Sequence, residues 1–185
     1  GSTHYGIEPD IITIAKGLTS AYAPLSGSIV SEKVWKVLED GTDEFGPIGH
    51  GWTYSAHPIC AAAGVANLNL SDDLGLLENA STVGNYLNQQ ITTALGDHPN
   101  VGEVRGEGML CAIDLTANRP TRAALDPGLK TGPSIAAAML KRGVIARAMP
   151  QGEIIGLAPP MCLTKDEADI IFAATKESVE EVLPR

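Results

Sequence analysis

Hydrophobic residues recur at helical spacing in two long stretches of the chain. The first stretch predicts an amphipathic helix that ends at Gly96, with apolar positions at Leu77, Ala80, Val83, Leu87, Ile91 and Ala94. The second lies near the C-terminus, where Thr164 and Glu167 form a capping box before it. Its predicted buried face comprises Ala168, Ile171, Phe172, Thr175 and Val179.

Shorter patterns fill the first third of the chain. Residues 10–14 (DIITI) are β-branched and predict a strand that runs into a tight turn at Ala15-Lys16-Gly17. Residues 24–31 predict a second strand, and Ser31 can cap a helix that ends before Gly41. Residues 41–56 predict a loop.

Another helix is expected to begin at Pro58, because proline suits the first position of a helix. This helix is so rich in Ala and Gly that a neighbouring element must pack closely against it. Its end near residues 71–75 is the predicted boundary between two parts of the chain, residues 1–72 and residues 73–185.

The remaining patterns again predict strands and helices in alternation. Residues 109–115 predict a buried strand, and residues 116–132 predict a loop. A helix is expected from Pro133 to Gly143, followed by short strands at 144–148 and 154–158. The alternation favours an α/β or α+β class.

Composition narrows the class of partner. The 185 residues carry a formal net charge of −9, which disfavours nucleic acid as a partner because phosphate backbones are repelled. No stretch is apolar enough to span a bilayer, so no membrane is expected. Three cysteines lie far apart in an odd number, which favours a reducing cytoplasm, and the four histidines show no metal-binding spacing, so no metal is expected.

Lys16 is the first candidate for chemistry. It follows an apolar strand and precedes Gly17, where the backbone can turn sharply. Partial desolvation there would depress the pKa of the amine and free it to form a Schiff base. The same pattern also fits a surface lysine at the end of a strand.

A second candidate is the glycine-rich segment at residues 49–55 (GHGWTYS). Glycines beside a hydroxyl residue can present N–H groups and an O–H group to a phosphate, and a helix is expected to begin nearby at Pro58. A flexible surface turn fits the same residues equally well.

Arg147 is the third candidate, because it lies inside the otherwise apolar run 144–148. Its charge cannot be neutralised and therefore needs an anionic partner. A substrate carboxylate would serve through a bidentate pair, and so would a structural Asp or Glu.

Taken in order, three runs resemble the class III aminotransferases that depend on pyridoxal phosphate (PLP), the ω-transaminase type in particular. They are PDIITIAKGLTSAYAPLSGSIVSEKVW (9–35), GHGWTYSAHPICAAAGVANL (49–68) and GVIARAMPQGEIIGLAPPMCLT (143–164). The resemblance implies fold type I of the PLP-dependent transferases, an α/β fold. It implies that residues 1–72 are the C-terminal part of the large PLP-binding domain and that residues 73–185 are the C-terminal small domain.

The resemblance also assigns roles to single residues. Lys16 matches the lysine that forms a Schiff base with PLP. Thr53 matches the threonine that binds the cofactor phosphate of the neighbouring subunit in a homodimer, with the Trp52 backbone beside it. Arg147 matches the arginine that pairs with a substrate carboxylate. The implied reaction moves an amino group from an amine or an ω- or β-amino acid to a keto acid such as pyruvate.

The resemblance places this chain in the C-terminal part of longer proteins. The aspartate that pairs with the pyridine nitrogen of PLP is expected before Gly1, so this chain alone is expected to be inactive. Two alternatives stay open: a PLP-dependent aminomutase or decarboxylase of the same fold, and an inactive fragment that acts only as a folded interaction module.

Overall fold

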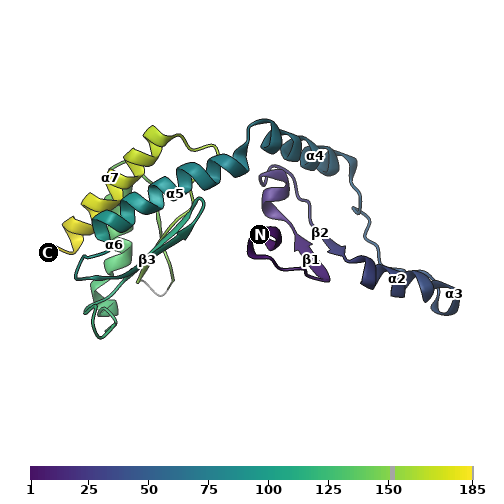
Figure 1. Cartoon of the computed structure of the whole chain (residues 1–185), viewed down its shortest axis with the longest axis horizontal. Coiled ribbons are helices and arrows are strands. Elements are labelled where there is room, and N and C mark those ends of the chain that lie inside the picture. Colours follow the sequence, from purple (N-terminus) through teal and green to yellow (C-terminus); the bar gives the residue numbers. More distant parts are fainter. Residues whose placement is uncertain (151–152, 185) are drawn as a thin grey trace. The chain divides into compact units, whose positions relative to one another are not determined.

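The chain divides into two units, Gly1–Asp73 and Leu74–Arg185 (Figure 1). The structure is a computed structural model that describes residues 1–150 and 153–184. No helix in these ranges combines the length and the apolar character that crossing a membrane requires.

The first unit is built on a two-stranded antiparallel ribbon and four helices. In chain order its elements are α1 (Ser2–Tyr5), β1 (Ile11–Ile14), the 3-10 turn η1 (Lys16–Thr19), β2 (Gly27–Val30), α2 (Glu32–Asp40), α3 (Thr42–Phe45) and α4 (Pro58–Asp73). β1 and β2 pair from Ile11 opposite Val30 to Ile14 opposite Gly27. The ribbon therefore brings the residues that follow β1 beside those that precede β2.

Two sequence predictions for this unit are confirmed at its helix starts. Ser31 caps α2, because its Oγ accepts a hydrogen bond from the Val34 amide at 3.4 Å. Pro58 is the first residue of α4. The loop predicted at residues 41–56 differs in one respect, because Thr42–Phe45 form the single helical turn α3.

The second unit is a four-stranded antiparallel sheet with one layer of helices. Its elements are α5 (Leu76–Leu95), β3 (Val101–Glu107), β4 (Leu110–Leu115), the 3-10 turn η2 (Pro127–Leu129), α6 (Thr131–Lys141), β5 (Arg147–Ala148), β6 (Ile154–Leu157) and α7 (Lys165–Val182). The strand order is β3-β4-β6-β5. α5 packs on β3, α6 packs on β5 and β6, and α7 contacts both helices.

The side chains of β4 explain why this sheet is covered on one face. Cys111, Ile113 and Leu115 alternate with less buried residues and pack into the core. On the other face Arg105 of β3 pairs with Glu103 at 3.0 Å and with Asp114 at 3.4 Å. One face is thus apolar and packed against helices, and the other is charged.

The helices meet this apolar face with most of the residues that the sequence periodicity predicts. The predicted Leu87 and Ile91 of α5 are 1% exposed or less, and so is Leu95, which was not predicted. The prediction is wrong at Leu77, which is 74% exposed. On α7 the predicted face is confirmed, since Ala168, Thr175 and Val179 are fully buried. The predicted capping box at the start of α7 is also present, with Thr164 Oγ1 accepting from the Glu167 amide.

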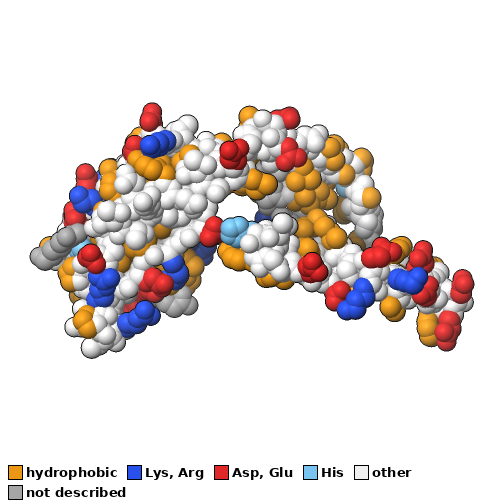
Figure 2. Space-filling view, in the orientation of Figure 1, with side chains coloured by type: hydrophobic (Ala, Val, Ile, Leu, Met, Phe, Trp, Pro, Cys, Tyr) orange, Lys and Arg blue, Asp and Glu red, His pale blue; other side chains and the backbone are white. Residues whose placement is uncertain are grey.

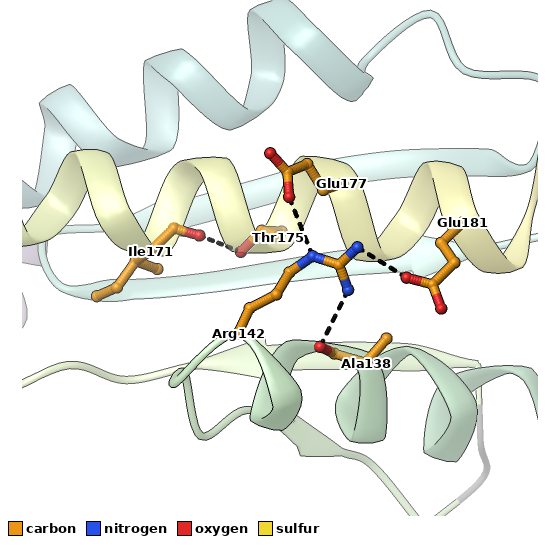
Figure 3. Close-up of polar contacts among 6 residues, drawn as sticks. All are labelled: Ala138, Arg142, Ile171, Thr175, Glu177 and Glu181. Atoms are coloured by element: carbon orange, nitrogen blue, oxygen red, sulfur yellow. Dashed lines mark hydrogen bonds and ion pairs between the residues drawn. The ribbon is translucent and has the colours of Figure 1, made fainter.

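Arg142 joins the end of α6 to the outer side of α7 (Figure 3). Its Nε donates to Glu177 at 3.0 Å, and its Nη2 lies 2.7 Å from a Glu181 oxygen. A third bond runs from Nη1 to the carbonyl of Ala138 at 3.2 Å. Hydrogen bonds to Glu181 and then to Glu177 raise the pKa of the Arg142 guanidinium. The guanidinium of Arg142 thus links α6 to α7 at a partly exposed position.

Sequence patterns were less reliable at the strands of this unit. They do not predict β3, whose sequence VGEVRGE contains two glycines and three charged residues. The strand predicted at 144–148 is reduced to β5, because the Val144 amide bonds to Met139 at the end of α6. α6 begins two residues before Pro133, which the first turn of a helix tolerates.

The two units differ in how much apolar surface they bury. Every residue of the main core cluster comes from Leu87 or later, and no large hydrophobic side chain of the first unit is buried. Figure 2 shows hydrophobic side chains gathered on the surface beside α4. Those exposed by more than half in α4 are Ile59, Val65, Leu68 and Leu70. Such exposed apolar area is typical of a surface that another segment or chain covers.

Substitution of Gly84 by alanine is expected to destabilise the second unit by about 2 kcal/mol. A Cβ on Gly84 would overlap the Gly108 carbonyl and lie 2.7 Å from the Met109 amide nitrogen, so α5 would have to move off the β3–β4 turn. Urea unfolding of the intact protein measures the effect. Asn85→Ala on the exposed side of α5 is the control and should stay within about 0.5 kcal/mol. An unchanged midpoint for Gly84→Ala would contradict this packing.

Candidate active site

Lys16 is the first residue after β1 that departs from extended backbone. It opens the turn η1 with a φ of 52°, and Ser20 and Ala21 follow with φ values of 49° and 62°. Each left-handed non-glycine residue costs on the order of 1–2 kcal/mol. The prediction that Gly17 supplies the sharp turn is therefore wrong, because Lys16 itself takes the left-handed conformation.

The turn lies against α4. Gly64 of α4 has no side chain, and a Cβ there would come within 2.9 Å of Leu25. The hydroxyl of the buried Thr19 donates to the Ala23 carbonyl at 2.6 Å, which closes the loop behind the lysine. The expected close packing on this Ala- and Gly-rich helix is thus found at Gly64.

Lys16 and Trp52 line the same open cavity of about 980 Å³. This volume is of the size that holds a cofactor or a small ligand. The polar members of its wall besides the lysine are Thr13, Ser26, Ser28 and His50. The His50 and Trp52 rings are 4.9 Å apart and meet edge to face. The structure therefore gathers an amine, hydroxyls and the aromatic rings of Trp35, His50 and Trp52 around one space.

The lysine is exposed within this chain. The predicted partial desolvation is thus not provided by the described residues. Trp52 is also open, with 72% of its surface exposed. Both side chains are accessible to a ligand or to a further segment that would cover the cavity.

Thr53 lies in a turn at residues 53–56 and is exposed. The Trp52 amide donates to Ser55 Oγ at 3.2 Å, and the Ser55 amide donates back to the Trp52 carbonyl at 2.9 Å. The Trp52 N–H is thus already engaged. In residues 1–150 and 153–184, neither the amide nor the hydroxyl of Thr53 has a partner, so both are available to an anion.

Arg147 belongs to the second unit, at the start of the two-residue strand β5. The expectation of an arginine enclosed in an apolar strand is wrong, because Arg147 is exposed and nearby Ile145 is 88% exposed. No carboxylate of the described ranges pairs with its guanidinium. The structural partner considered from the sequence is therefore not found there, and the guanidinium is free to bind an external anion.

The cysteines and the possible metal ligands of the described residues form no second candidate site. Only Cys111 of the three cysteines is buried, and burial raises the pKa of its thiol to about 11. Cys60 is half-buried and Cys162 is exposed, and all three are free thiols. The part of the chain that the structure describes contains no cluster of three or more His, Cys, Asp or Glu arranged for a metal ion.

Sequence reasoning missed Asn67, whose side chain contacts the lysine turn from α4. Its signal is weak, since it is one of two asparagines in the second half of the helix, and nothing in the sequence distinguishes it from Asn69. It also missed the hydroxyls of Ser26 and Ser28, which reach the cavity only because β2 pairs with β1.

Comparison with known proteins places these residues in a family. The model of the class III aminotransferases matches residues 1–179. A diaminobutyrate–2-oxoglutarate transaminase of Halomonas elongata is 55% identical over 98% of this chain and 39% of its own length.

Solved structures of transaminases are also similar to this chain. A transaminase from directed evolution by ancestral reconstruction is 57% identical with a TM-score of 0.94, over 98% of this chain and 40% of that one. An amine transaminase from an uncultivated Pseudomonas species, solved in its PLP-bound form, is 36% identical with a TM-score of 0.88 over the same shares. The chain thus spans about two fifths of the length of the proteins it matches.

The predicted fold class is confirmed by these likenesses. The mixed helices and sheets of both units follow transaminase structures of the PLP-dependent fold type I at high TM-score. The family model covers the lysine turn, the glycine-rich segment and Arg147 together. The chain belongs to the class III aminotransferase family.

Proposed function

We propose that the intact protein is a PLP-dependent transaminase. It moves an amino group from an amine or an ω- or β-amino acid to a keto acid such as pyruvate or 2-oxoglutarate. The observation that carries the proposal is the cavity in which Lys16, on its left-handed turn, faces the hydroxyls and rings described above. The name of the Halomonas relative supports a diamino acid donor and a 2-oxo acid acceptor.

The residues present fit the chemistry of PLP in three respects. The exposed primary amine of Lys16 can bond covalently to an aldehyde, and the open cavity leaves room for a ring. The free N–H and O–H of Thr53 suit a phosphate. Bound PLP would supply an electron sink for the amino-bearing carbon.

The chain's own residues would then act as follows. Lys16 would hold the cofactor through Nζ, and its free amine would act as the general base and acid that moves the proton of the amino-bearing carbon. Arg147 binds the carboxylate of the keto acid through two parallel hydrogen bonds. Trp52 forms part of the wall beside the lysine.

We propose that two copies share their sites. Trp52 lines the cavity of its own Lys16, whereas the adjacent Thr53 does not. This division fits a Thr53 that binds the cofactor phosphate of a neighbouring subunit. The first unit would belong to the large cofactor-binding domain, whose other parts would cover its exposed apolar residues, and the second unit would be the small domain.

Substitution of Thr53 by valine is expected to weaken PLP binding about tenfold, because hydrogen bonds to a charged phosphate contribute about 1.5–3 kcal/mol. Thr53→Ser keeps the hydroxyl and should stay within about threefold of the parent. Equilibrium dialysis of PLP against the intact protein measures both. If the valine and serine variants bind PLP with equal affinity, the hydroxyl of Thr53 does not bind the phosphate.

Product analysis tests the proposed reaction. The intact protein is incubated with PLP, 2,4-diaminobutyrate or another amine, and either pyruvate or 2-oxoglutarate. A transaminase forms alanine or glutamate only when amine and keto acid are both present. Release of CO₂ without a keto acid would identify a decarboxylase, and isomerisation of the amino acid alone would identify an aminomutase. Either outcome would replace the proposal.

A further inference from the structure

The side chain of Asn67 binds the lysine turn with both of its polar atoms. Its Nδ2 donates to the Gly17 carbonyl at 2.9 Å and to the Leu18 carbonyl at 3.3 Å. Its Oδ1 accepts from the Ser20 hydroxyl at 2.6 Å. One short side chain on α4 thus contacts three of the four residues that follow Lys16.

The backbone of this turn is held weakly by its own hydrogen bonds. The amides of Leu18, Ser20 and Ala21 donate to carbonyls of residues 15–17, each at 3.2 Å. That distance is at the long end for an N–H···O bond. The left-handed residues Lys16, Ser20 and Ala21 make the turn unfavourable in isolation. Two of the three bonds of Asn67, at 2.6 Å and 2.9 Å, are shorter than these backbone bonds and add contacts that can fix the conformation of the turn.

The packing of α4 explains how so short a side chain reaches the turn. Gly64 lies three residues before Asn67, on the same face of the helix. A Cβ at Gly64 would come within 2.9 Å of Leu25 and 3.8 Å of the Leu18 carbonyl. The bare backbone at Gly64 lets the helix approach until Asn67 can bond directly to the carbonyls.

We propose that Asn67 is a positioning residue that holds the Lys16 backbone in the conformation from which its amine bonds to PLP. The inference rests on the proposed function of Lys16. A lysine on a fixed backbone reacts at a higher effective concentration than one on a mobile loop. Asn67 therefore strengthens the covalent attachment of PLP and leaves its noncovalent contacts unchanged.

A double-mutant cycle separates this role from a general effect on the fold. The dissociation constant of PLP is measured for the intact protein, Asn67→Ala, Lys16→Ala and the double variant. With Lys16 present, Asn67→Ala should raise the dissociation constant about tenfold, as expected when hydrogen bonds worth about 1.4 kcal/mol in total are lost. In the Lys16→Ala background the same change should stay within about twofold.

Two further variants calibrate the cycle. Ser71→Ala is the matched control, because Ser71 lies on the next turn of α4 and its hydroxyl bonds only within the helix, to the Asn67 carbonyl at 2.8 Å. It should leave the dissociation constant unchanged. Ser20→Ala removes only the hydroxyl that donates to Asn67, and we expect about a threefold rise that again requires Lys16. Ser20→Ala carries the same test if Asn67→Ala does not fold.

The outcomes distinguish the inference from the proposed function. Equal effects of Asn67→Ala, or of Ser20→Ala, with and without Lys16 would overturn the positioning role and leave the role of Lys16 intact. If Lys16→Ala leaves PLP binding unchanged and the cofactor is not attached at this lysine, the proposed role of Lys16 is rejected. The positioning role of Asn67 is then rejected with it, because it rests on the role of Lys16. A larger effect in the presence of Lys16 supports both.

Discussion

Replacement of Lys16 by alanine is expected to lower kcat/KM for amino transfer by at least about 10⁴-fold. Under the proposed function, the variant would lose both the covalent hold on PLP and the amine that moves the proton of the amino-bearing carbon. Among the described residues, 1–150 and 153–184, Lys16 is the only lysine that lines the cavity, so this part of the chain offers no second amine. Initial rates of keto-acid-dependent alanine or glutamate formation measure the loss.

Lys33→Ala provides the control for this prediction. Lys33 is on α2, its side chain is 80% exposed, and its Nζ lies 3.1 Å from Asp10. Exposed pairs of this kind contribute little, so the variant should keep kcat/KM within about twofold. A Lys16→Ala protein that retains a tenth or more of the parent activity would remove Lys16 from the reaction.

Replacement of Arg147 by alanine is expected to raise the KM for the keto acid about 100-fold. The free, exposed guanidinium of Arg147 would bind the carboxylate through two charge-assisted hydrogen bonds, together worth about 2.7 kcal/mol. The KM of a monoamine donor without a carboxylate should change by less than about threefold, because that donor has no anion for the arginine to bind. Steady-state kinetics with each substrate varied in turn measure both constants.

The variant Arg147→Lys tests whether binding of the keto acid needs the planar guanidinium group. Arg147→Lys keeps the charge but replaces the bidentate geometry by a single ammonium group, so an intermediate rise of about tenfold in the keto-acid KM is expected. Arg122→Ala, at another exposed arginine of the same unit, should have no effect. Equal increases in KM for the keto acid and for the monoamine would contradict a carboxylate-binding role.

The elements that the sequence predicted well are those with a long periodic signal or a specific cap. The apolar faces of α5 and α7 follow directly from helical spacing, and the caps at Ser31 and Thr164 depend on residues adjacent in sequence. β3 escaped prediction because its pairing with β4 supplies the order that its glycines and charges do not encode.

The residues of the candidate site could be proposed from the sequence, but their conformations could not. The run AKGLTSAYAPL pointed to Lys16, yet nothing in it indicates the left-handed φ of that residue. Nor does it indicate the hydrogen bonds to the turn from Asn67, which lies 51 positions along the chain. The exposed position of Arg147 depends on where α6 ends, since the Val144 amide completes that helix instead of a strand. Local sequence cannot specify such contacts, because both partners are fixed only when distant segments pack.

The covalent attachment point of the cofactor tests the central proposal most directly. The intact, PLP-loaded protein is reduced with borohydride and digested, and the modified peptide is identified by mass spectrometry. The proposal predicts a single phosphopyridoxyl group on Lys16, which disappears in Lys16→Ala and persists in Lys33→Ala. A label on another lysine, or an unlabelled Lys16 in a protein that carries the label elsewhere, would contradict it.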